Sequence, residues 1–321
     1  MMPANFNPNI STTFEPVRDC WYLTGATASG KTRVGVELAK LLNAEIVSID
    51  SMSVYREMNI GTAKPTDEQR SEVPHHLLDV VAPTDEYSLS QYIRDAHGII
   101  ADIRSRGREV LFVGGTPLYL KALLRGVYPG PPADWDFRDQ IEAELETVGI
   151  EALHARLEQV DPLAASKLHP NDKRRIIRAL EVYKQTGQPL SHEQTHFDDV
   201  PHERCKAFVM SWPRATLHRR IEARVEGMFQ AGLVDEVESL LERYGDLGRT
   251  AAQAVGYREA IELLRGDQDL AATVQQVQAR TRQFARRQET WFRNLIECEF
   301  VPLREEPDPV TFARRIIELS G

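Results

Sequence analysis

The stretch Cys20–Leu42, CWYLTGATASGKTRVGVELAKLL, decides the fold of this chain. Its apolar start, CWYLT, is typical of a short buried strand, and the pattern from Lys31 to Leu42 is that of a helix. Between them the letters read G-x-x-x-x-G-K-T, a phosphate-binding loop in its required place between a strand and a helix. The predicted phosphate-binding residues are Gly25, Ala26, Thr27, Ala28, Ser29, Gly30, Lys31 and Thr32.

Each part of this loop has a physical role in holding phosphates. Gly25 and Gly30 let the backbone curl so that its N–H groups point inward at phosphate oxygens. The N-terminus of the following helix adds its positive dipole end. Lys31 supplies a positive charge, and the Thr32 hydroxyl is the predicted ligand of Mg²⁺.

Further strand patterns alternate with helix patterns in the first part of the chain. EIVSI (45–49), HLLDVVAP (76–83) and EVLFV (109–113) are predicted strands, and residues 90–106 form a predicted helix that stops at Gly107. Strands that alternate with helices indicate an α/β fold, with a parallel sheet flanked by helices around a P-loop.

The character of the chain changes after Leu124. GVYPGPPADWD (126–136) is a proline- and glycine-rich break, residues 137–186 show only helical patterns, and KAFVMSW (206–212) is a predicted returning strand. We therefore predict an α/β core interrupted by an all-helical insertion domain. The predicted parts are a disordered polar tail (1–17), the first part of the core (18–131), the insertion (132–202) and the second part of the core with C-terminal helices (203–321).

Composition favours an ordinary globular protein in a reducing compartment. Hydrophobic residues make up 42% and charged residues 27% of the 321 residues. No apolar run reaches the length of about 18 residues that a membrane span needs, and the N-terminus lacks the pattern of a signal peptide. Cys20, Cys205 and Cys298 lie far apart without metal-ligand spacing, which fits a cytoplasmic location.

The net charge of −9 argues against a nucleic-acid partner, but the charges are segregated along the chain. Residues 134–158 are rich in acids, whereas residues 166–184 and the arginine-rich stretch 280–293 are basic. Local basic surfaces, and not the overall charge, decide whether a polyanion can dock. The basic stretches 171–183, 217–225 and 280–293 together favour an anionic partner larger than a nucleotide.

Two strand ends carry the predicted chemistry. Asp50 directly follows the strand 45–49, at the edge where α/β sheets bind ligands, so it is a candidate base, a candidate magnesium ligand or a helix N-cap. The strand 109–113 ends in Gly114, Gly115 and Thr116, without the magnesium-holding aspartate of phosphoryl-transfer enzymes. Its glycines suit the close approach of a ligand, and its threonine offers a neutral hydroxyl.

One motif resembles a zinc-protease site by spacing alone. His192, Glu193 and His196, followed by His202, match that pattern. The motif needs a helix to place both histidines on one face, and here prolines flank it and an apolar face is nearly absent. We therefore predict a solvated polar linker and no zinc.

The whole set of motifs resembles the bacterial tRNA dimethylallyltransferase family (tRNA isopentenyltransferases). The likeness extends from Trp21 to about Phe300, and the order and spacing of the motifs make it specific. The motifs are GATASGKT, IVSIDSMSVYREMNIGTAKPT, VPHHLLDV, FVGGTPLYLKALLRG, LHPNDKRRIIRALEVY, AVGYRE and FARRQETWFR.

This resemblance implies transfer of a dimethylallyl group from its diphosphate to the N6 amine of the adenosine adjacent to the anticodon in tRNA. It implies that the glycine loop binds the diphosphate with Mg²⁺ nearby, that Asp50 is the base, and that Lys31 and Thr116 belong to the catalytic site. Arg220 and Arg224 are candidate diphosphate contacts. The implied tRNA contacts are Asp50, Ser51, Met52, Ser53, Arg138, Arg174, Arg175, Arg178, Gln253, Gly256, Tyr257, Arg258, Arg286, Arg287, Gln288, Trp291 and Arg293.

The chain departs from the family pattern at a few positions. Ala26 replaces a proline common in the loop, Ser53 stands where many relatives have glutamine, and Glu289 places an acid in the arginine-rich stretch. Two alternative functions would use the same loop. One is a small-molecule or nucleotide kinase, and the other is an RNA-binding ATP-dependent switch without covalent chemistry. We expect a monomer that binds tRNA and dimethylallyl diphosphate and has no membrane partner.

Overall fold

A computed structural model describes residues 13–193, 197 and 205–321 of the chain. These residues form two compact units. The larger unit contains the described residues of 17–124 and 205–321, and the smaller unit contains those of 13–16 and 125–197. No helix among the described residues is both long enough and apolar enough to cross a lipid bilayer.

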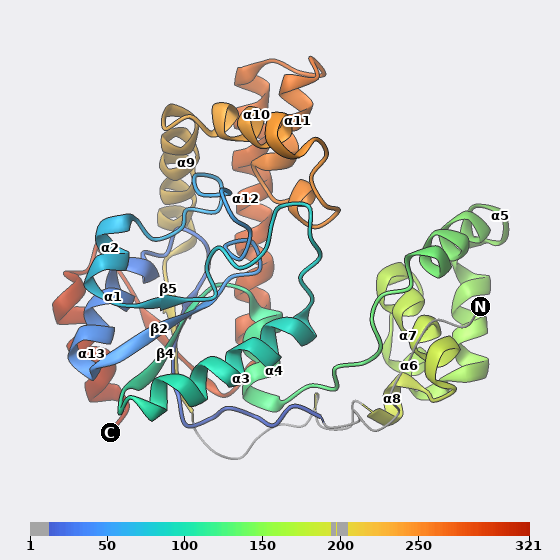
Figure 1. Ribbon diagram of the computed structural model, residues 1–321, viewed down its shortest axis with the longest axis horizontal. Helices are drawn as coiled ribbons and strands as arrows, with labels where there is room; N and C mark the ends of the chain where they lie inside the picture. Colours follow the sequence, from blue (N-terminus) through green and yellow to red (C-terminus); the bar gives the residue numbers. More distant parts are fainter. Residues whose placement is uncertain (1–12, 194–196, 198–204) are drawn as a thin grey trace. The chain divides into compact units, whose positions relative to one another are not determined.

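The larger unit is built on a six-stranded sheet whose strand pairs are all parallel (Figure 1). Its strand order is β3-β2-β4-β1-β5-β6. The strands are all short; they are β1 (Trp21–Gly25), β2 (Ala44–Ile49), β3 (His75–His76), β4 (Glu109–Gly114), β5 (Lys206–Ser211) and β6 (Cys298–Pro302). The prediction of an α/β fold with a parallel sheet is confirmed.

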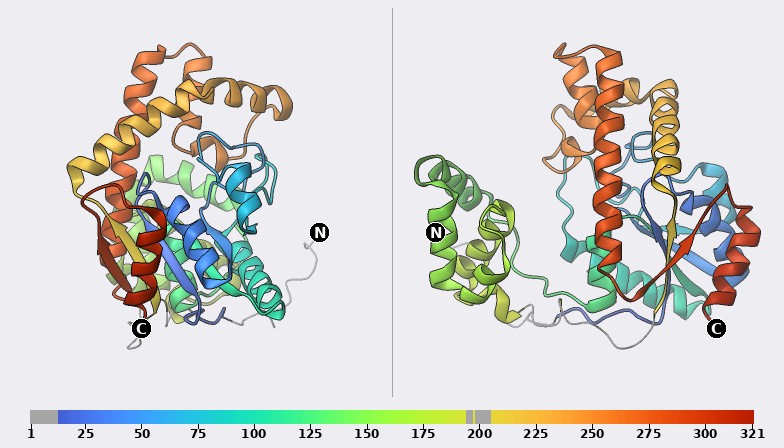
Figure 2. Two further views of the ribbon diagram at one scale, coloured as in Figure 1. Left: turned by 90° about the vertical axis from the view of Figure 1, so that its left-hand side faces the viewer. Right: turned by 180° about the vertical axis from the view of Figure 1, so that it is seen from behind.

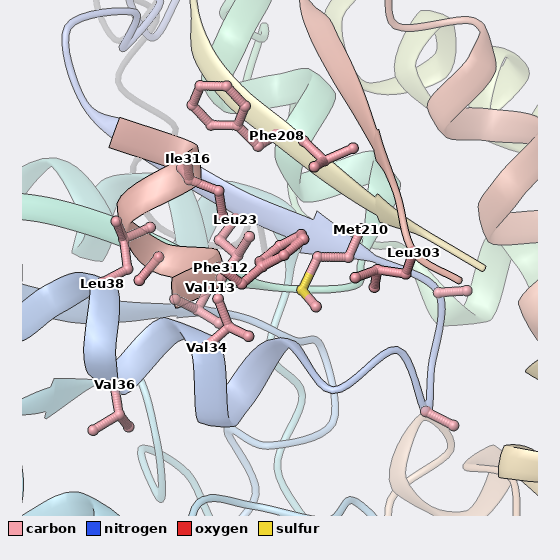
Figure 3. Close-up of a cluster of buried hydrophobic side chains, with 14 of the residues drawn as sticks. Leu23, Val34, Val36, Leu38, Val113, Phe208, Met210, Leu303, Phe312 and Ile316 are labelled. Atoms are coloured by element: carbon pink, nitrogen blue, oxygen red, sulfur yellow. The ribbon is translucent and has the colours of Figure 1, made fainter. Parts of the chain in front are cut away.

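One face of this sheet packs on α1 (Lys31–Leu42) and α13 (Pro309–Leu319). Figure 3 shows Leu23 and Phe208 of the strands facing Val34 of α1 and Phe312 of α13. The alternate residues of the strands point to the opposite face, where the Tyr22 and Phe112 rings stack with centroids 5.0 Å apart. The central strands β1, β2, β4 and β5 are therefore buried on both faces, as parallel strands usually are.

Three further helices complete the α/β part of the larger unit. They are α2 (Asp67–Glu72), α3 (Leu89–Ser105) and α4 (Pro117–Arg125). Tyr92 of α3 stacks on Tyr119 of α4 at 4.1 Å and donates a hydrogen bond to the Ser48 carbonyl at 2.9 Å. This contact holds both helices near the carboxyl end of β2.

A second group of helices in the larger unit follows β5. It consists of α9 (Arg214–Gln230), α10 (Leu233–Tyr244), a 3₁₀ turn η1 (Ala251–Gln253), α11 (Tyr257–Leu264) and α12 (Leu270–Arg293). Figures 1 and 2 show α9 and α12 side by side, with α10 and α11 at the end away from the sheet. An ion pair of 3.0 Å between Arg282 and Glu222 joins α12 to α9.

The smaller unit contains only helices among its described elements. They are α5 (Trp135–Val160), which Gly149 interrupts with a left-handed φ of 79°, α6 (Pro162–Lys167), α7 (Lys173–Thr186) and α8 (Leu190–Glu193). Their own apolar core includes Phe137, Leu157 and Leu180. His192 and Glu193 of the zinc-protease pattern lie in α8, whereas His196 and His202 lie outside the described residues.

Two predictions of local structure were wrong. The polar tail was expected to continue to residue 17, but Phe14 pairs with Val127 in an antiparallel bridge, and the buried Val17 donates to the Leu123 carbonyl at 2.7 Å. The strand expected at 76–83 ends at residue 76, because Leu77 (φ 58°) and Asp79 (φ 57°) adopt left-handed conformations that interrupt an extended chain.

Candidate active site

The glycine loop connects the end of β1 to the first turn of α1. Gly30 has a left-handed φ of 90°, and α1 begins at the next residue. Within the part of the chain that the structure describes, the N–H groups of Gly30, Lys31 and Thr32 have no hydrogen-bond partner. The buried Ser29 Oγ also lacks one there. An anion at this helix start would satisfy these N–H groups.

Trp212 and Arg220 hold the carbonyl side of the loop. Trp212 Nε1 donates to the Ser29 carbonyl at 2.9 Å, and Arg220 Nε donates to the Ala28 carbonyl at 2.7 Å. The carbonyl and the N–H of a trans peptide point in opposite directions. The bond to Ser29 therefore turns the N–H of Gly30 away from Trp212, toward the side where a ligand would bind.

Arg220 is thus placed at the loop, as a diphosphate contact would need to be. Its guanidinium lies 4.6 Å from the centroid of the Trp212 ring and also pairs with Glu306. Trp212 was not predicted as a site residue. Its position directly after β5, the strand that pairs with β1 on the side away from β4, is the signal in the sequence that could have identified it.

Gln288 of α12 joins the loop to the neighbouring strand end. Its side chain is buried; Oε1 accepts the N–H of Thr27 at 2.9 Å, and Nε2 donates to the Gly115 carbonyl at 2.6 Å. A Cβ on Gly115 would lie 2.8 Å from that Nε2, so this glycine makes room for Gln288. Both ends of the Gln288 side chain are therefore engaged within the larger unit, and its expected contact with tRNA would require these bonds to break.

Two cations and one carboxylate share the space beside the loop. Burial, together with the positive charge of Arg224, lowers the pKa of Lys31 to about 8, against the opposing effect of Asp50. Burial also lowers the pKa of Arg224, and Asp50 again opposes the shift. Cations that are desolvated and close together favour the binding of an anion. Lys31, Arg224 and Asp50, which belong to three distant motifs, therefore influence one another electrostatically.

Asp50 directly follows β2, and its side chain is half-buried. Its Oδ1 accepts the N–H groups of Met52 at 2.8 Å and Ser53 at 3.3 Å, which is the capping role that the sequence allowed. Its Oδ2 accepts no hydrogen bond from any residue that the structure describes. The carboxylate is therefore oriented through one oxygen while the other remains available to a substrate.

Thr116 and the two glycines before it bring the ends of β2 and β4 together. The N–H groups of Gly115 and Thr116 donate to the Ile49 carbonyl at 2.9 and 3.0 Å, and Thr116 Oγ1 accepts the N–H of Ser51 at 3.1 Å. A Cβ on Gly114 would lie 2.2 Å from the Ile49 carbonyl oxygen. Gly114 thus admits the backbone of β2, and Gly115 makes room for the Gln288 side chain and lies beside Lys31, where a Cβ would be 3.4 Å from Nζ.

Many of the expected tRNA contacts in the larger unit have accessible side chains. Arg258 pairs with Glu262 at 2.9 Å, and Arg293 lies 3.8 Å from Glu289. Such exposed ion pairs are weak, so a phosphate group could replace the acid. The accessible or partly accessible residues are Ser51, Met52, Gln253, Arg258, Arg286, Arg287, Trp291 and Arg293.

Two other expected tRNA contacts of this unit are buried. Ser53 Oγ lies 3.0 Å from Ser48 Oγ, beneath the turn that Asp50 caps. Tyr257 is fully buried and donates its hydroxyl hydrogen to Glu236 at 2.5 Å. The side chains of Ser53 and Tyr257 therefore face the interior. Gly256, which precedes Tyr257, is the N-cap of α11 and has a left-handed φ of 97°.

In the smaller unit, Arg138 and Arg178 are engaged by a buried carboxylate. Glu181 is fully buried and accepts hydrogen bonds from Arg138 Nε at 2.7 Å and Arg178 Nη1 at 2.5 Å. Burial acts to raise the pKa of Glu181, but these hydrogen bonds outweigh it and lower the pKa. Arg178 also donates to the Pro131 carbonyl at 2.8 Å. The expected tRNA contacts of this unit with exposed side chains are Arg174 and Arg175.

The residues present fit a magnesium ion that is held mainly by a substrate. The described residues contain no group of three or more His, Cys, Asp or Glu side chains that could bind a metal by themselves. Mg²⁺ in proteins commonly keeps several waters and is completed by substrate phosphates. The hydroxyl of Thr32, half-buried in the first turn of α1, is the group that would contact it.

Comparison with known proteins extends this picture. Residues 53–295 match the sequence profile of the IPP transferase family, and residues 19–79 match that of isopentenyl transferase. The chain is 48% identical over 289 residues to the tRNA dimethylallyltransferase of Rhodopirellula baltica, covering 87% of this chain and 86% of that protein. It is 44% identical to tRNA dimethylallyltransferase 2 of Geotalea uraniireducens, covering 92% and 95%.

Solved structures agree with these sequences. The full-length tRNA isopentenylpyrophosphate transferase of Bacillus halodurans has 37% identity and a TM-score of 0.66, with 94% of each chain covered. A eukaryotic dimethylallyltransferase acting on tRNA has 27% identity and a TM-score of 0.71, covering 89% of this chain and 74% of the other. By profile, identity and fold, this chain belongs to the tRNA dimethylallyltransferase family.

Proposed function

We propose that this protein transfers the dimethylallyl group of dimethylallyl diphosphate to the N6 amine of the adenosine adjacent to the anticodon in tRNA, releasing diphosphate. The observation that carries this proposal is that Gly115 connects the two parts of the site. Its N–H donates to the carbonyl of Ile49, the residue before Asp50, and a Cβ on Gly115 would lie 3.4 Å from Nζ of Lys31, in the loop that Arg220 also contacts. The cations suit a departing diphosphate, and the carboxylate suits an amine that must lose a proton. Family membership supplies the two substrates.

At the donor end, the bond between the allylic carbon and the diphosphate oxygen breaks. An allylic carbon ionises readily when the negative charge of its leaving group is stabilised. The N–H groups of Gly30, Lys31 and Thr32, with the charges of Lys31, Arg220 and Arg224, would supply that stabilisation. The Thr32 hydroxyl would hold Mg²⁺, which would supply further positive charge to the leaving group.

At the acceptor end, the N6 amine forms the new bond to carbon and loses one proton. The lone pair of an aromatic amine is delocalised into its ring, so a positioned base should accelerate the reaction by roughly 10²–10⁴-fold. Asp50 Oδ2 is the group that would accept the proton, because Oδ1 is held by Met52 and Ser53. Thr116 would act indirectly, by fixing the backbone at Ser51.

The tRNA would be held by the accessible cations of α12 and of the smaller unit. Arg286, Arg287, Arg174 and Arg175 are exposed and are suited to phosphates of the anticodon stem. An adenine inside a stack is inaccessible, so the base must be turned out to reach Asp50. We place this reaction in the cytoplasm, where its tRNA substrate is found, and expect the protein to act as a monomer.

Product analysis tests the proposal. The protein is incubated with an unmodified tRNA transcript, Mg²⁺ and either dimethylallyl diphosphate or ATP, and the digested nucleosides are analysed by mass spectrometry. We expect an adenosine in which one dimethylallyl group replaces one hydrogen, only with the prenyl donor. Phosphorylated product from ATP, or tRNA binding without any change in nucleoside mass, would contradict the proposal.

A further inference from the structure

Glu236, near the start of α10, contacts two segments that are far apart in the sequence. Its Oε2 accepts the backbone N–H groups of Asn59 at 3.0 Å and Ile60 at 2.8 Å, and its Oε1 lies 3.5 Å from the N–H of Gly61. The same Oε1 accepts the Tyr257 hydroxyl at 2.5 Å. One carboxylate therefore joins the loop between β2 and α2 to the first residue of α11.

Close packing reinforces this junction. A Cβ on Gly61 would lie 2.3 Å from Cε2 of the Tyr257 ring and 3.0 Å from Leu233, so only a glycine allows the loop to lie against the ring. Tyr257 is fully buried, and burial together with the Glu236 carboxylate raises its pKa, which keeps its hydroxyl protonated as a donor. Successive backbone N–H groups around one carboxylate form a strong anion site.

A rigid path leads from the junction back to the proposed base. Between Asp50 and Asn59, the side chains of Val54, Tyr55 and Met58 are fully buried. The Val54 carbonyl accepts the N–H of Val80 at 2.7 Å, and the N–H of Arg56 donates to the Val81 carbonyl at 2.9 Å. A displacement at Asn59 would therefore be transmitted to Asp50 and not absorbed by a flexible loop.

A second bond of the same kind joins the other end of α10 to this loop. Glu57 accepts the Tyr244 hydroxyl at 2.8 Å and pairs with Arg243 at 2.8 Å. The loop thus offers backbone donors to the beginning of α10 and a carboxylate to its end. These two bonds define the orientation of α10 against the loop that begins at Asp50 (Figure 1).

We propose that Glu236 is a positioning residue that fixes the loop after Asp50 against the Gln253–Arg258 segment. This contact would place the proposed base and the tRNA-binding segment at the same adenosine. The inference rests on the proposed function, because it assumes that Asp50 takes a proton from tRNA. Glu236 itself touches neither substrate. Its contribution is to the geometry of the acceptor end, and it leaves the diphosphate loop unchanged.

The first test compares Glu236→Ala with Glu238→Ala, an exposed acid on the same helix. A misplacement of about 1 Å at a reacting group costs roughly 10²-fold, so Glu236→Ala should slow single-turnover transfer by about that factor. The KM for dimethylallyl diphosphate should stay unchanged. Glu236→Gln, which can still accept backbone N–H groups, should lose less. A Glu236→Ala rate equal to that of Glu238→Ala would overturn the inference.

The second test separates positioning from a general loss of structure. In an Asp50→Asn background the base is already lost, so adding Glu236→Ala should change the residual rate by no more than about twofold. Equal slowing in both backgrounds would overturn the inference. If Glu236→Ala fails to fold, Glu236→Gln and Tyr257→Phe, which keeps the buried ring, are tested in the same cycle and must show the same non-additivity. A wild-type protein that transfers no prenyl group would instead refute the proposed function.

Discussion

Replacing Gln288 with leucine tests whether the glycine loop depends on a link from α12. Leucine fits a buried site of this size but can neither accept the N–H of Thr27 nor donate to the Gly115 carbonyl. Each buried group left without a partner costs about 1–3 kcal/mol, so the loss of both bonds in Gln288→Leu should lower the free energy of unfolding by roughly 2–6 kcal/mol. For a chain of this size the melting temperature should fall by roughly 3–9 °C.

The same variant has a specific effect on catalysis. Because Thr27 lies in the phosphate loop, we expect the KM for dimethylallyl diphosphate to rise while the Kd for tRNA stays near the wild-type value. Thermal unfolding, steady-state kinetics with the donor varied, and tRNA binding measure these three quantities. Arg287→Leu, at the neighbouring exposed position, is the matched control. It should weaken tRNA binding and leave the KM for dimethylallyl diphosphate and the melting temperature unchanged.

One pattern of results would refute this reasoning. A Gln288→Leu protein with an unchanged melting temperature and an unchanged donor KM, but weaker tRNA binding, would mean that the side chain faces tRNA. Gln288 would then contact tRNA, as the family resemblance implies, and would not support the phosphate loop. Weaker binding of both dimethylallyl diphosphate and tRNA would also contradict this reasoning, because a link between the loop and a strand end should affect only the binding of the donor.

Three further predictions concern the charged groups. Asp50→Asn should reduce the transfer rate by roughly 10²–10⁴-fold with tRNA binding kept, and a rate within tenfold of wild type would exclude it as the base. Lys31 loses its charge as pH rises through about 8, so kcat/KM for the donor should fall above that pH. Lys31→Arg, which stays charged, should abolish this fall, and an identical pH profile in both proteins would contradict the assignment. Arg286→Ala with Arg287→Ala should weaken tRNA binding and reduce its salt slope by about one for each lost phosphate contact, which binding titrations at several salt concentrations would measure.

The sequence predicted those parts of the molecule that depend on short stretches of chain. The glycine loop needs only local spacing, and the alternation of strands and helices needs only periodicity, so both could be read directly. Asp50 could be recognised because it follows a strand at once. The prediction of a strand at 76–83 was wrong because Leu77 and Asp79 adopt left-handed conformations. Neither residue is a glycine, so the sequence gives no sign of this.

The supporting groups of the site could not be predicted, because their partners are backbone atoms of distant segments. Trp212 meets Ser29 across 183 positions, and Gln288 meets Thr27 across 261. Every residue except proline has the same backbone carbonyl and N–H groups, so no sequence pattern indicates which side chain will bond to a given one. Only the folded chain shows that Trp212, Gln288 and Glu236 act on the backbone.

The basic segments illustrate a different limit. Arg174 and Arg178 lie four residues apart and were expected on one tRNA-binding face, but Arg178 bonds to the buried Glu181 while Arg174 is exposed. A cation held by a buried carboxylate is costly to detach, because it leaves that carboxylate unpaired. Spacing in the sequence predicts that two side chains lie on one helix face. It does not show whether either side chain is already bonded to another residue of the same chain.

The strand ends beside the loop support the proposal that the loop binds the phosphates of a leaving group. Phosphoryl-transfer enzymes with this loop place a magnesium-holding aspartate at a neighbouring strand end. Here that end is Gly114, where even a Cβ would lie 2.2 Å from the Ile49 carbonyl oxygen, so no aspartate side chain fits at that position. Gly114 instead allows the ends of β2 and β4 to lie close together. The carboxylate of the site belongs to Asp50, the residue directly after β2. A carboxylate held through one oxygen and free at the other is suited to accept a proton from an incoming amine, and the leaving diphosphate is left to the loop and its cations.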